Sequence, residues 1–269
     1  MQASEPDGVV AMELVILGAG PAYSDIPGAV GSSYLVRAGG AAVVLDLGQG
    51  AFPALAGAVE PSALAGVLIS HLHPDHFIDL IPLRHYLCRA EFQPARRLRL
   101  VAPTGIDRRL DGAYDTPGFA ASAFDMEAPV DGPVLVGPFE VTSVRVRHAG
   151  ESRAWRVALP GGGPAVTYSG DAADPDELAR LLRPGDLLLS EATFGVGPVP
   201  PGMNHLDGPM VGALATHGRA GQLVITHVRM GCDLDATVAA ARTAYGGPIA
   251  MARPGSRFSV APPGPGHTP

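Results

Sequence analysis

The sequence "HLHPDH" at residues 71–76 limits what this chain can become more than any other stretch. It follows the apolar run "ALAGVLIS", which predicts a strand. If the chain stays extended beyond that strand, His71 and His73 point the same way, because side chains alternate along it. The proline that comes next can begin a helix, so that Asp75 and His76 fall in a first helical turn. Three imidazoles and a carboxylate in this arrangement indicate a metal site, since Zn²⁺ and similar divalent ions accept mixed nitrogen and oxygen ligands.

This cluster offers too many ligands for one tetrahedral ion and too few for two. Further ligands are therefore expected at the ends of other strands. Three residues fit: His148 ends "VTSVRVRH", Asp171 follows "AVTYSG" and His227 ends "LVITH". Each comes directly after an apolar run, so all three can project into a shared cleft at one edge of a sheet.

Short apolar runs typical of strands alternate along the chain with helical patterns. Strands are expected at 12–17, 33–37, 41–47, 65–70, 98–103, 139–148, 153–160, 165–170, 186–192, 221–227 and 247–252. Apolar spacing of three and four predicts helices at 52–59, 174–183, 208–218 and 233–245. The mixture predicts an α/β protein in which two packed sheets are flanked by helices. We expect one domain over residues 1–260 and a flexible tail rich in proline and glycine at 261–269.

The charge balance argues against an extended nucleic-acid surface. The chain carries 19 basic and 26 acidic residues and a net charge of −7, whereas nucleic-acid binders usually present a basic face. No basic leader and no apolar stretch of about 18 residues is found, so neither a signal peptide nor a membrane span is expected. Cys88 and Cys232 are the only cysteines, which favours a reduced, cytoplasmic protein. A small anionic substrate is the expected partner, and a homodimer is left open.

The stretch "LGAGPAYSDIPG" at residues 17–28 follows a predicted strand and carries two of the glycines of a dinucleotide-binding loop. Tyr23 occupies the third glycine position, two prolines interrupt the stretch, and no helical pattern follows. A nucleotide loop needs its strand and helix, so this stretch is interpreted as a turn.

Read together, the motifs resemble the metallo-β-lactamase fold superfamily. The resemblance runs from "LVILGAG" through "VVLDLGQG", "ISHLHPDH", "RHAG", "TYSGD" and "SEATF" to "ITHV". Within that superfamily the chain is most similar to the ribonuclease Z-related phosphodiesterase branch, especially its actinobacterial cyclic-nucleotide phosphodiesterase-like members. The resemblance implies a four-layer αββα sandwich and two divalent ions, with Zn²⁺ favoured and Mn²⁺ or Fe²⁺ as alternatives. It implies one ion on His71, His73 and His148, the other on Asp75, His76 and His227, and Asp171 bridging both.

The same resemblance implies roles for residues around the ions. Asp75 would orient the nucleophile as well as bind metal, and His205 would donate a hydrogen bond or proton to the phosphate or leaving group. Asp46 and Glu191 would fix the ligand histidines. For Asp46, a simple turn acceptor after a strand is an equal alternative.

The chain also departs from ribonuclease Z. Ser190 stands where the transfer-RNA processors of this branch carry a histidine, and about twenty residues between His148 and Asp171 leave no room for an RNA-gripping arm. The favoured function is therefore a metal-dependent phosphodiesterase for a small phosphodiester such as a cyclic nucleotide. A lactone or thioester hydrolase on the same metals and a biosynthetic accessory metalloprotein are the alternatives, because fold does not fix function.

Overall fold

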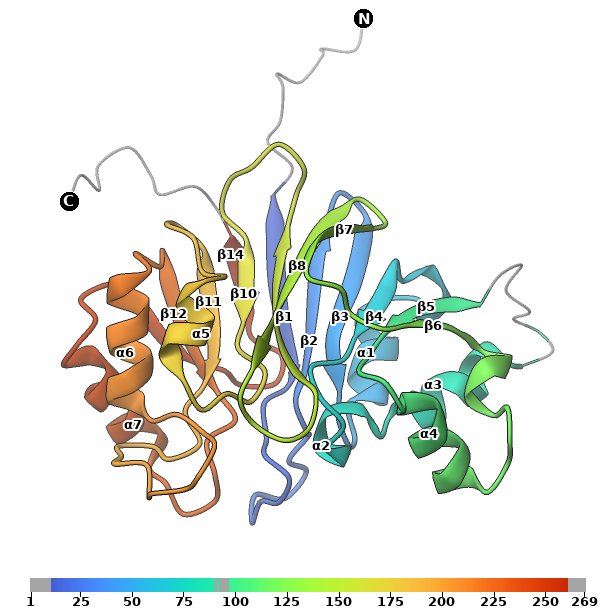
Figure 1. The fold of residues 1–269 in the computed structure, drawn as a ribbon, viewed down its shortest axis with the longest axis horizontal. Helices are drawn as coiled ribbons and strands as arrows, with labels where there is room; N and C mark the ends of the chain where they lie inside the picture. The colour runs from blue at the N-terminus through green and yellow to red at the C-terminus, as the bar shows by residue number, and fades with distance from the viewer. Residues whose placement is uncertain (1–10, 90, 92–96, 261–269) are drawn as a thin grey trace, which may run out of the picture.

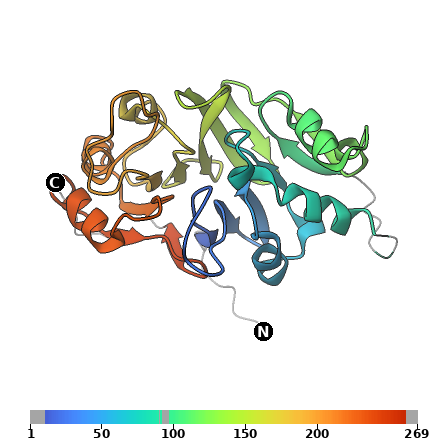
Figure 2. The same ribbon diagram turned by 90° about the horizontal axis from the view of Figure 1, so that it is seen from below.

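Two β-sheets pack face to face and carry helices on both outer faces (Figure 1). The structure is a computed structural model that describes residues 11–89, 91 and 97–260. Seen from below, the helices of the N-terminal half and those of the C-terminal half lie on opposite sides of the sheets (Figure 2). The predicted αββα sandwich is confirmed. The predicted tail at 261–269 lies outside the described residues, and the single-domain boundary stays a prediction.

The first sheet is mixed: β14, β1, β2 and β3 pair antiparallel, and β3 to β6 pair parallel. In spatial order its strands are β14 (Arg257–Val260), β1 (Met12–Gly18), β2 (Ser33–Ala38), β3 (Ala41–Leu47), β4 (Gly66–Leu68), β5 (Leu98–Val101) and β6 (Phe124–Glu127).

The second sheet has parallel pairs from β13 to β10 and antiparallel pairs from β10 to β7. In spatial order its strands are β13 (Ile249–Met251), β12 (Gln222–Thr226), β11 (Leu187–Glu191), β10 (Val166–Tyr168), β9 (Ser152–Ala158), β8 (Phe139–Val146) and β7 (Gly132–Val136).

The helices fall into two sets, one for each sheet. They are α1 (Phe52–Ala58), α2 (Pro74–Phe77), α3 (Leu80–Leu87) and α4 (Ile106–Tyr114) in the first half, and α5 (Pro175–Ala179), α6 (Gly208–His217) and α7 (Leu234–Arg242) in the second, with 3₁₀ turns at Pro61–Ala63 and Ala120–Ser122. Asp174, Asp207 and Asp233 cap α5, α6 and α7 by accepting backbone N–H bonds. The helix predicted at 174–183 is shorter: α5 ends at Ala179 and a turn follows at 180–181.

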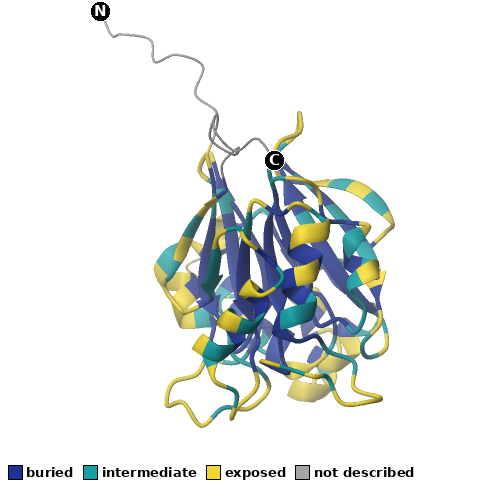
Figure 3. Cartoon of the chain, turned by 90° about the vertical axis from the view of Figure 1, so that its left-hand side faces the viewer, coloured by how far each residue is buried: buried dark blue, intermediate teal, exposed yellow. Residues whose placement is uncertain are grey.

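Three apolar layers hold the sandwich together. The central layer lies between the sheets and contains Leu14, Trp155 and Val224. One outer layer packs α1, α3 and α4 on the first sheet, and the other packs α5, α6 and α7 on the second. Strands β3 and β12 are buried along nearly their whole length, as the continuous runs at 41–47 and 221–227 predict (Figure 3). Within the described residues, no helix is long and apolar enough to cross a membrane.

Two tyrosines connect the sheets by buried hydrogen bonds. Tyr168 of β10 donates from Oη to Asp46 Oδ2 of β3 at 2.7 Å, and Tyr34 of β2 lies 2.7 Å from Thr226 Oγ1 of β12. The two rings are 5.0 Å apart. Burial raises the pKa of both phenols, and the charge of Asp46 raises that of Tyr168 further, so both stay protonated.

Because Tyr168 donates to a carboxylate and Tyr34 contacts a hydroxyl, their removal should differ in cost. We expect Tyr168→Phe to lower the free energy of unfolding by about 1.5–3 kcal/mol and Tyr34→Phe by about 0.5–1.5 kcal/mol. Urea unfolding in the presence of a chelator measures both, with an unchanged dependence on urea as evidence that the folded state is intact. Equal losses of unfolding free energy in the two variants would contradict a stronger hydrogen bond to the buried carboxylate of Asp46.

Candidate metal centre

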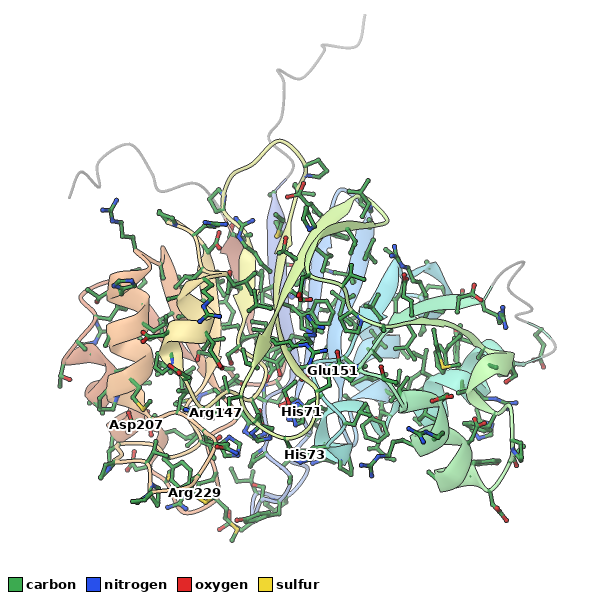
Figure 4. The ribbon with its side chains drawn as sticks, in the orientation of Figure 1. His71, His73, Arg147, Glu151, Asp207 and Arg229 are labelled. Atoms are coloured by element: carbon green, nitrogen blue, oxygen red, sulfur yellow. The ribbon has the colours of Figure 1, made fainter. Side chains whose placement is uncertain are left out.

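The predicted site residues gather at one edge of the sandwich, where several strands end. His71 follows β4, His148 follows β8, Asp171 follows β10 and His227 follows β12. Strands β8, β10 and β12 run in the same direction, so their carboxyl ends meet at this edge. Figure 4 shows His71 and His73 near the middle of this lower edge, below the strands of both sheets.

The turn at 71–76 adopts the conformation that its sequence predicts. His73 is extended at φ −83° and ψ 140°, Pro74 opens α2, and Asp75 and His76 lie buried in that helix. The turn packs closely against the loop after β3: a side chain at Gly48 would collide with the carbonyl oxygen of Asp75. Glycine at position 48 therefore lets the ligand turn approach the end of the sheet.

The seven predicted ligands form two groups that could hold cations. Within each group the candidate ligand atoms lie within 4.8 Å of one another. The first group consists of His71, His73, His148 and Asp171, and the second of Asp75, His76 and His227. The histidines divide between the groups as the resemblance implies, while Asp171, for which the resemblance implies a bridging position, falls in the first group.

Asp171 lies between the two groups. Its Oδ2 is 3.8 Å from His71 Nε2 and 3.6 Å from His148 Nε2 on one side, and 3.7 Å from His227 Nε2 on the other. Its Oδ1 is 3.5 Å from His76 Nε2. A single carboxylate can therefore reach ligands of both groups.

Four histidine rings are anchored through Nδ1, which leaves Nε2 facing the centre. His71 Nδ1 lies 3.0 Å from Ser70 Oγ and His76 Nδ1 lies 2.7 Å from Asp46 Oδ2. The remaining partners are the carbonyl oxygen of Asn204 for His148, at 2.8 Å, and Thr193 Oγ1 for His227, at 3.1 Å. With the Nδ1 proton held by oxygen, each Nε2 faces the centre and is the atom that would bind a metal ion.

The donor set fits divalent ions. His71 Nε2 and Asp171 Oδ1 are buried and have no hydrogen-bond partner among the described residues, although such atoms are costly to leave unpaired. Nε2 of His76 and Nε2 of His227 lie 3.3 Å apart with Asp75 Oδ2 beside them. Two cations bound among these atoms would give each of them a partner.

The electrostatics of the cluster favour added positive charge. Burial would raise the pKa of Asp171, but the neighbouring histidines outweigh burial and hold the pKa far below its usual range. Burial lowers the pKa of His71 well below its usual value, with His76 adding to the effect, so His71 is a neutral ligand. For His76, burial is outweighed by Asp171, Asp46 and Asp75, which raise its pKa to about 10. The ionised carboxylates thus keep a proton on His76, which a metal ion would replace.

His205 lies beside the second group, on the loop before α6. Its Nδ1 is 3.0 Å from Glu191 Oε1 and 3.9 Å from Asp171 Oδ2, and Nε2 has no hydrogen-bond partner among the described residues. Burial lowers the pKa of His205, but the bond and charge of Glu191 raise it by more. His205 could also join Asp171 and His227 in holding a cation, which is a role that the sequence did not predict.

The two carboxylates expected to fix ligands act in different ways. Asp46 binds His76 directly and reaches His71 through Ser70, whose Oγ donates to Asp46 at 2.7 Å. It also accepts the N–H of Ser70, which lies 24 residues away, so this bond is a tertiary one and not that of a local turn. Glu191 binds His205 directly but reaches His227 only through Thr193, whose Oγ1 donates to it at 2.6 Å.

Four supporting residues were not predicted. Ser70, Thr193 and Asn204 each anchor a ligand histidine, and Tyr168 binds Asp46. Each of the first three adjoins a motif, which is a signal that could have found them. Nothing in the sequence near Tyr168 points to a residue 122 positions away.

The backbone is strained at two of these positions. Asp46 and His227 have φ of 55° and 54°, a left-handed conformation that costs non-glycine residues energy. Both residues are held there by tertiary bonds, Asp46 by its four donors and His227 by the N–H bond to the carbonyl of Ala19. Such strain is concentrated at functional sites in proteins.

Comparison with known proteins places this geometry in a family. The family model described as "Beta-lactamase superfamily domain" matches residues 43–228. The Mycobacterium leprae protein ML1173 is 30% identical over 261 residues, covering 95% of this chain and 91% of the relative. The Bacillus subtilis protein called "Probable metallo-hydrolase YhfI" is 25% identical over 246 residues, covering 91% of this chain and 98% of the relative.

Solved structures share the fold. The crystal structure of YhfI has a TM-score of 0.81 at 24% identity, covering 93% of this chain and 99% of that one. Human tRNase Z, short form, has a TM-score of 0.69 at 20% identity, covering 92% and 99%. A diphosphatase of the PhnP family has a TM-score of 0.70 at 19% identity, covering 92% and 97%. Because the family match extends from β3 to β12 and so includes both ligand groups, the chain belongs to the β-lactamase superfamily of metallo-hydrolase folds.

Proposed function

We propose that this protein is a dinuclear metal-dependent phosphodiesterase that acts on a small phosphodiester such as a cyclic nucleotide. One observation carries the proposal: two groups of nitrogen and oxygen ligands lie on either side of Asp171, and His205 stands beside them with Nε2 unpaired. The names of a diphosphatase and a tRNase among proteins of the same fold support phosphate chemistry.

The proposal assigns His71, His73 and His148 to one ion, Asp75, His76 and His227 to the other, and Asp171 to both. When bound, divalent ions, with Zn²⁺ favoured over Mn²⁺ and Fe²⁺, would make a deprotonated water available near neutral pH and offset charge on the phosphoryl oxygens. The protein's own part is to hold the ligand atoms ready. The four Nδ1 anchors fix ring orientation, so little reorganisation is needed when substrate binds.

Two side chains would act on the substrate and the attacking water. Asp75 is buried and points Oδ2 towards His76 and His227 at 3.5 and 3.3 Å, where it would accept a hydrogen bond from the nucleophile and align it. His205, oriented by Glu191 through Nδ1, would present Nε2 to the phosphate or leaving oxygen and hold the proton that departs with it.

The proposal also covers the kind of substrate and the location of the protein. The substrate is small and anionic, and no extended nucleic-acid surface takes part, in keeping with a net charge of −7. Cys88 and Cys232 are free thiols, which supports a cytoplasmic location.

The proposal is tested by measuring turnover of bis(p-nitrophenyl) phosphate against a panel of lactones in metal-loaded protein. Faster turnover of the lactones would reject phosphodiester chemistry.

Removing one buried ligand should remove metal and activity together. We expect His71→Ala to lower the number of bound ions per chain, measured by elemental analysis, and to abolish bis(p-nitrophenyl) phosphate hydrolysis. A chelator should lower the melting temperature of the wild type but have a smaller effect on the variant, because bound metal stabilises the folded state. His85→Ala, an exposed histidine of α3, is the matched control and should change neither property. Full metal content in His71→Ala would contradict the assignment.

Loss of His205 should affect turnover but not metal content. If His205 protonates the leaving group, His205→Ala should lower kcat by about 10²- to 10⁴-fold for poor leaving groups. The loss should shrink for p-nitrophenolate, which leaves without a proton. A series of aryl leaving groups measures the effect, with His217→Ala at the exposed end of α6 as the control. Parallel plots of rate against leaving-group pKa for wild type and variant would exclude the acid role.

Transfer-RNA precursors should be poor substrates. β9 and β10 form a simple antiparallel pair between His148 and Asp171, and Ser190 is buried with Oγ bonded to the carbonyl of Glu191. We expect cleavage of a precursor to be far slower than hydrolysis of a small phosphodiester in the same metal-loaded sample. Comparable rates in a gel assay would overturn this expectation.

A further inference from the structure

A cavity of about 340 Å³ opens beside the metal centre. Its walls come from the turn after β1, from His227 and Val228 after β12, and from the chain after β13. Larger hollows of about 630 and 540 Å³ lie elsewhere, and neither is lined by a residue of the centre. Because His227 belongs both to this cavity and to the second ligand group, a molecule in the cavity would adjoin a phosphate at the metal ions.

The walls are mostly apolar. Ile26, Val30, Val228, Leu234 and Met251 contribute aliphatic surface. The volume is near the lower end of the about 300–1,000 Å³ usual for small-molecule pockets. One compact organic group would fit such a space, and a chain of several nucleotides would not.

Besides His227, two polar side chains line the cavity. Arg253 is exposed, and its guanidinium forms no hydrogen bond or ion pair with any residue that the structure describes. Ser24 Oγ accepts the N–H of Ile26 at 3.1 Å, which leaves its hydroxyl proton free to donate. An unpaired guanidinium favours the face of an aromatic ring or acceptor atoms on its edge over a saturated hydrocarbon. It also complements the negative charge of a phosphate ester.

We propose that this cavity binds one ester group of the substrate and selects a compact, ring-containing group that carries hydrogen-bond acceptors. The proposal rests on the phosphodiesterase function and names the substrate class for it. In this arrangement the metal centre would bind the phosphate, the aliphatic walls would bury the ring, and Arg253 would contact the ring at the mouth. The turn at 17–28, which the sequence shows only as a loop, would then be a determinant of specificity.

The test compares phenyl phosphate with methyl phosphate, using inorganic phosphate as the probe of the anion site alone. Calorimetric titration of metal-loaded protein gives the three affinities for wild type and variants. In a hydrophobic pocket even one methylene is worth about 10- to 200-fold in discrimination, so the wild type should favour phenyl phosphate over methyl phosphate by at least about tenfold. An equal affinity for the two esters would overturn the proposal.

Ala29→Trp should fill the cavity. Ala29 lines it and is exposed, so a larger side chain there does not disturb the core. The preference for phenyl phosphate should fall towards one while the affinity for inorganic phosphate stays unchanged. Ala22→Trp is the matched control, because Ala22 is an exposed residue of the same turn that does not line the cavity, and it should keep the preference.

Arg253→Met should lower the preference without affecting inorganic phosphate, and Arg180→Met, at an exposed position beyond α5, should change neither. Weaker binding of inorganic phosphate in Arg253→Met would show that Arg253 binds the anion itself and would reject its assigned role. Sedimentation of Ala29→Trp tests self-association: a change of oligomeric state with an unchanged preference would assign the cavity to a second copy and overturn the proposal.

Failure of this inference differs from failure of the phosphodiesterase proposal. Hydrolysis of bis(p-nitrophenyl) phosphate together with an unchanged preference in Ala29→Trp would reject the ester-group pocket alone. Absence of hydrolysis in fully metal-loaded wild type would reject the phosphodiesterase, and with it the substrate class drawn from it.

Discussion

The buried carboxylate of Asp46 is the constraint on which the rest of the structure depends. It accepts four hydrogen bonds, from the N–H and the hydroxyl of Ser70, from His76 and from Tyr168. These donors come from the end of β4, from α2 and from the opposite sheet. A fully buried charge is tolerated only when its acceptor sites are filled, so the ligand turn and both sheets must take up one relative arrangement. The left-handed backbone at Asp46 is a cost that this arrangement offsets.

The hydrogen bonds of Asp46 also orient the candidate metal ligands. The carboxylate fixes His76 directly and His71 through Ser70, while Glu191 and Thr193 fix His205 and His227 on the other side. Imidazole rings held in this way cannot rotate away when no cation is bound. The centre therefore concentrates ionised carboxylates and inward-facing imidazole nitrogens at the end of the sandwich, where the low dielectric strengthens their attraction for a divalent ion.

The sheets and the loops position different parts of the site. Ligands at strand ends are held in place by the packed core. The walls of the adjacent cavity come mainly from turns. Turns tolerate substitution better than strands, so members of one superfamily can keep a metal centre and change the group that they bind beside it. Fold and metal site alone thus leave the substrate open, and the turn at 17–28 together with Arg253 is where this chain would define it.

The sequence by itself determined the layers of the fold and the candidate ligands. The apolar runs 41–47 and 221–227 predict the buried strands that they form, and the spacing of "HLHPDH" brings its side chains together through local backbone rules. Local patterns were silent on β6, β7, β14, α3 and α4, whose short or mixed sequences owe their structure to pairing and packing partners elsewhere in the chain. The bond from Tyr168 to Asp46, the anchor from Asn204 to His148 and the cavity between Ile26 and Arg253 join residues far apart in sequence. Only the tertiary structure decided these features, because each depends on how two sheets and their loops meet rather than on any one segment.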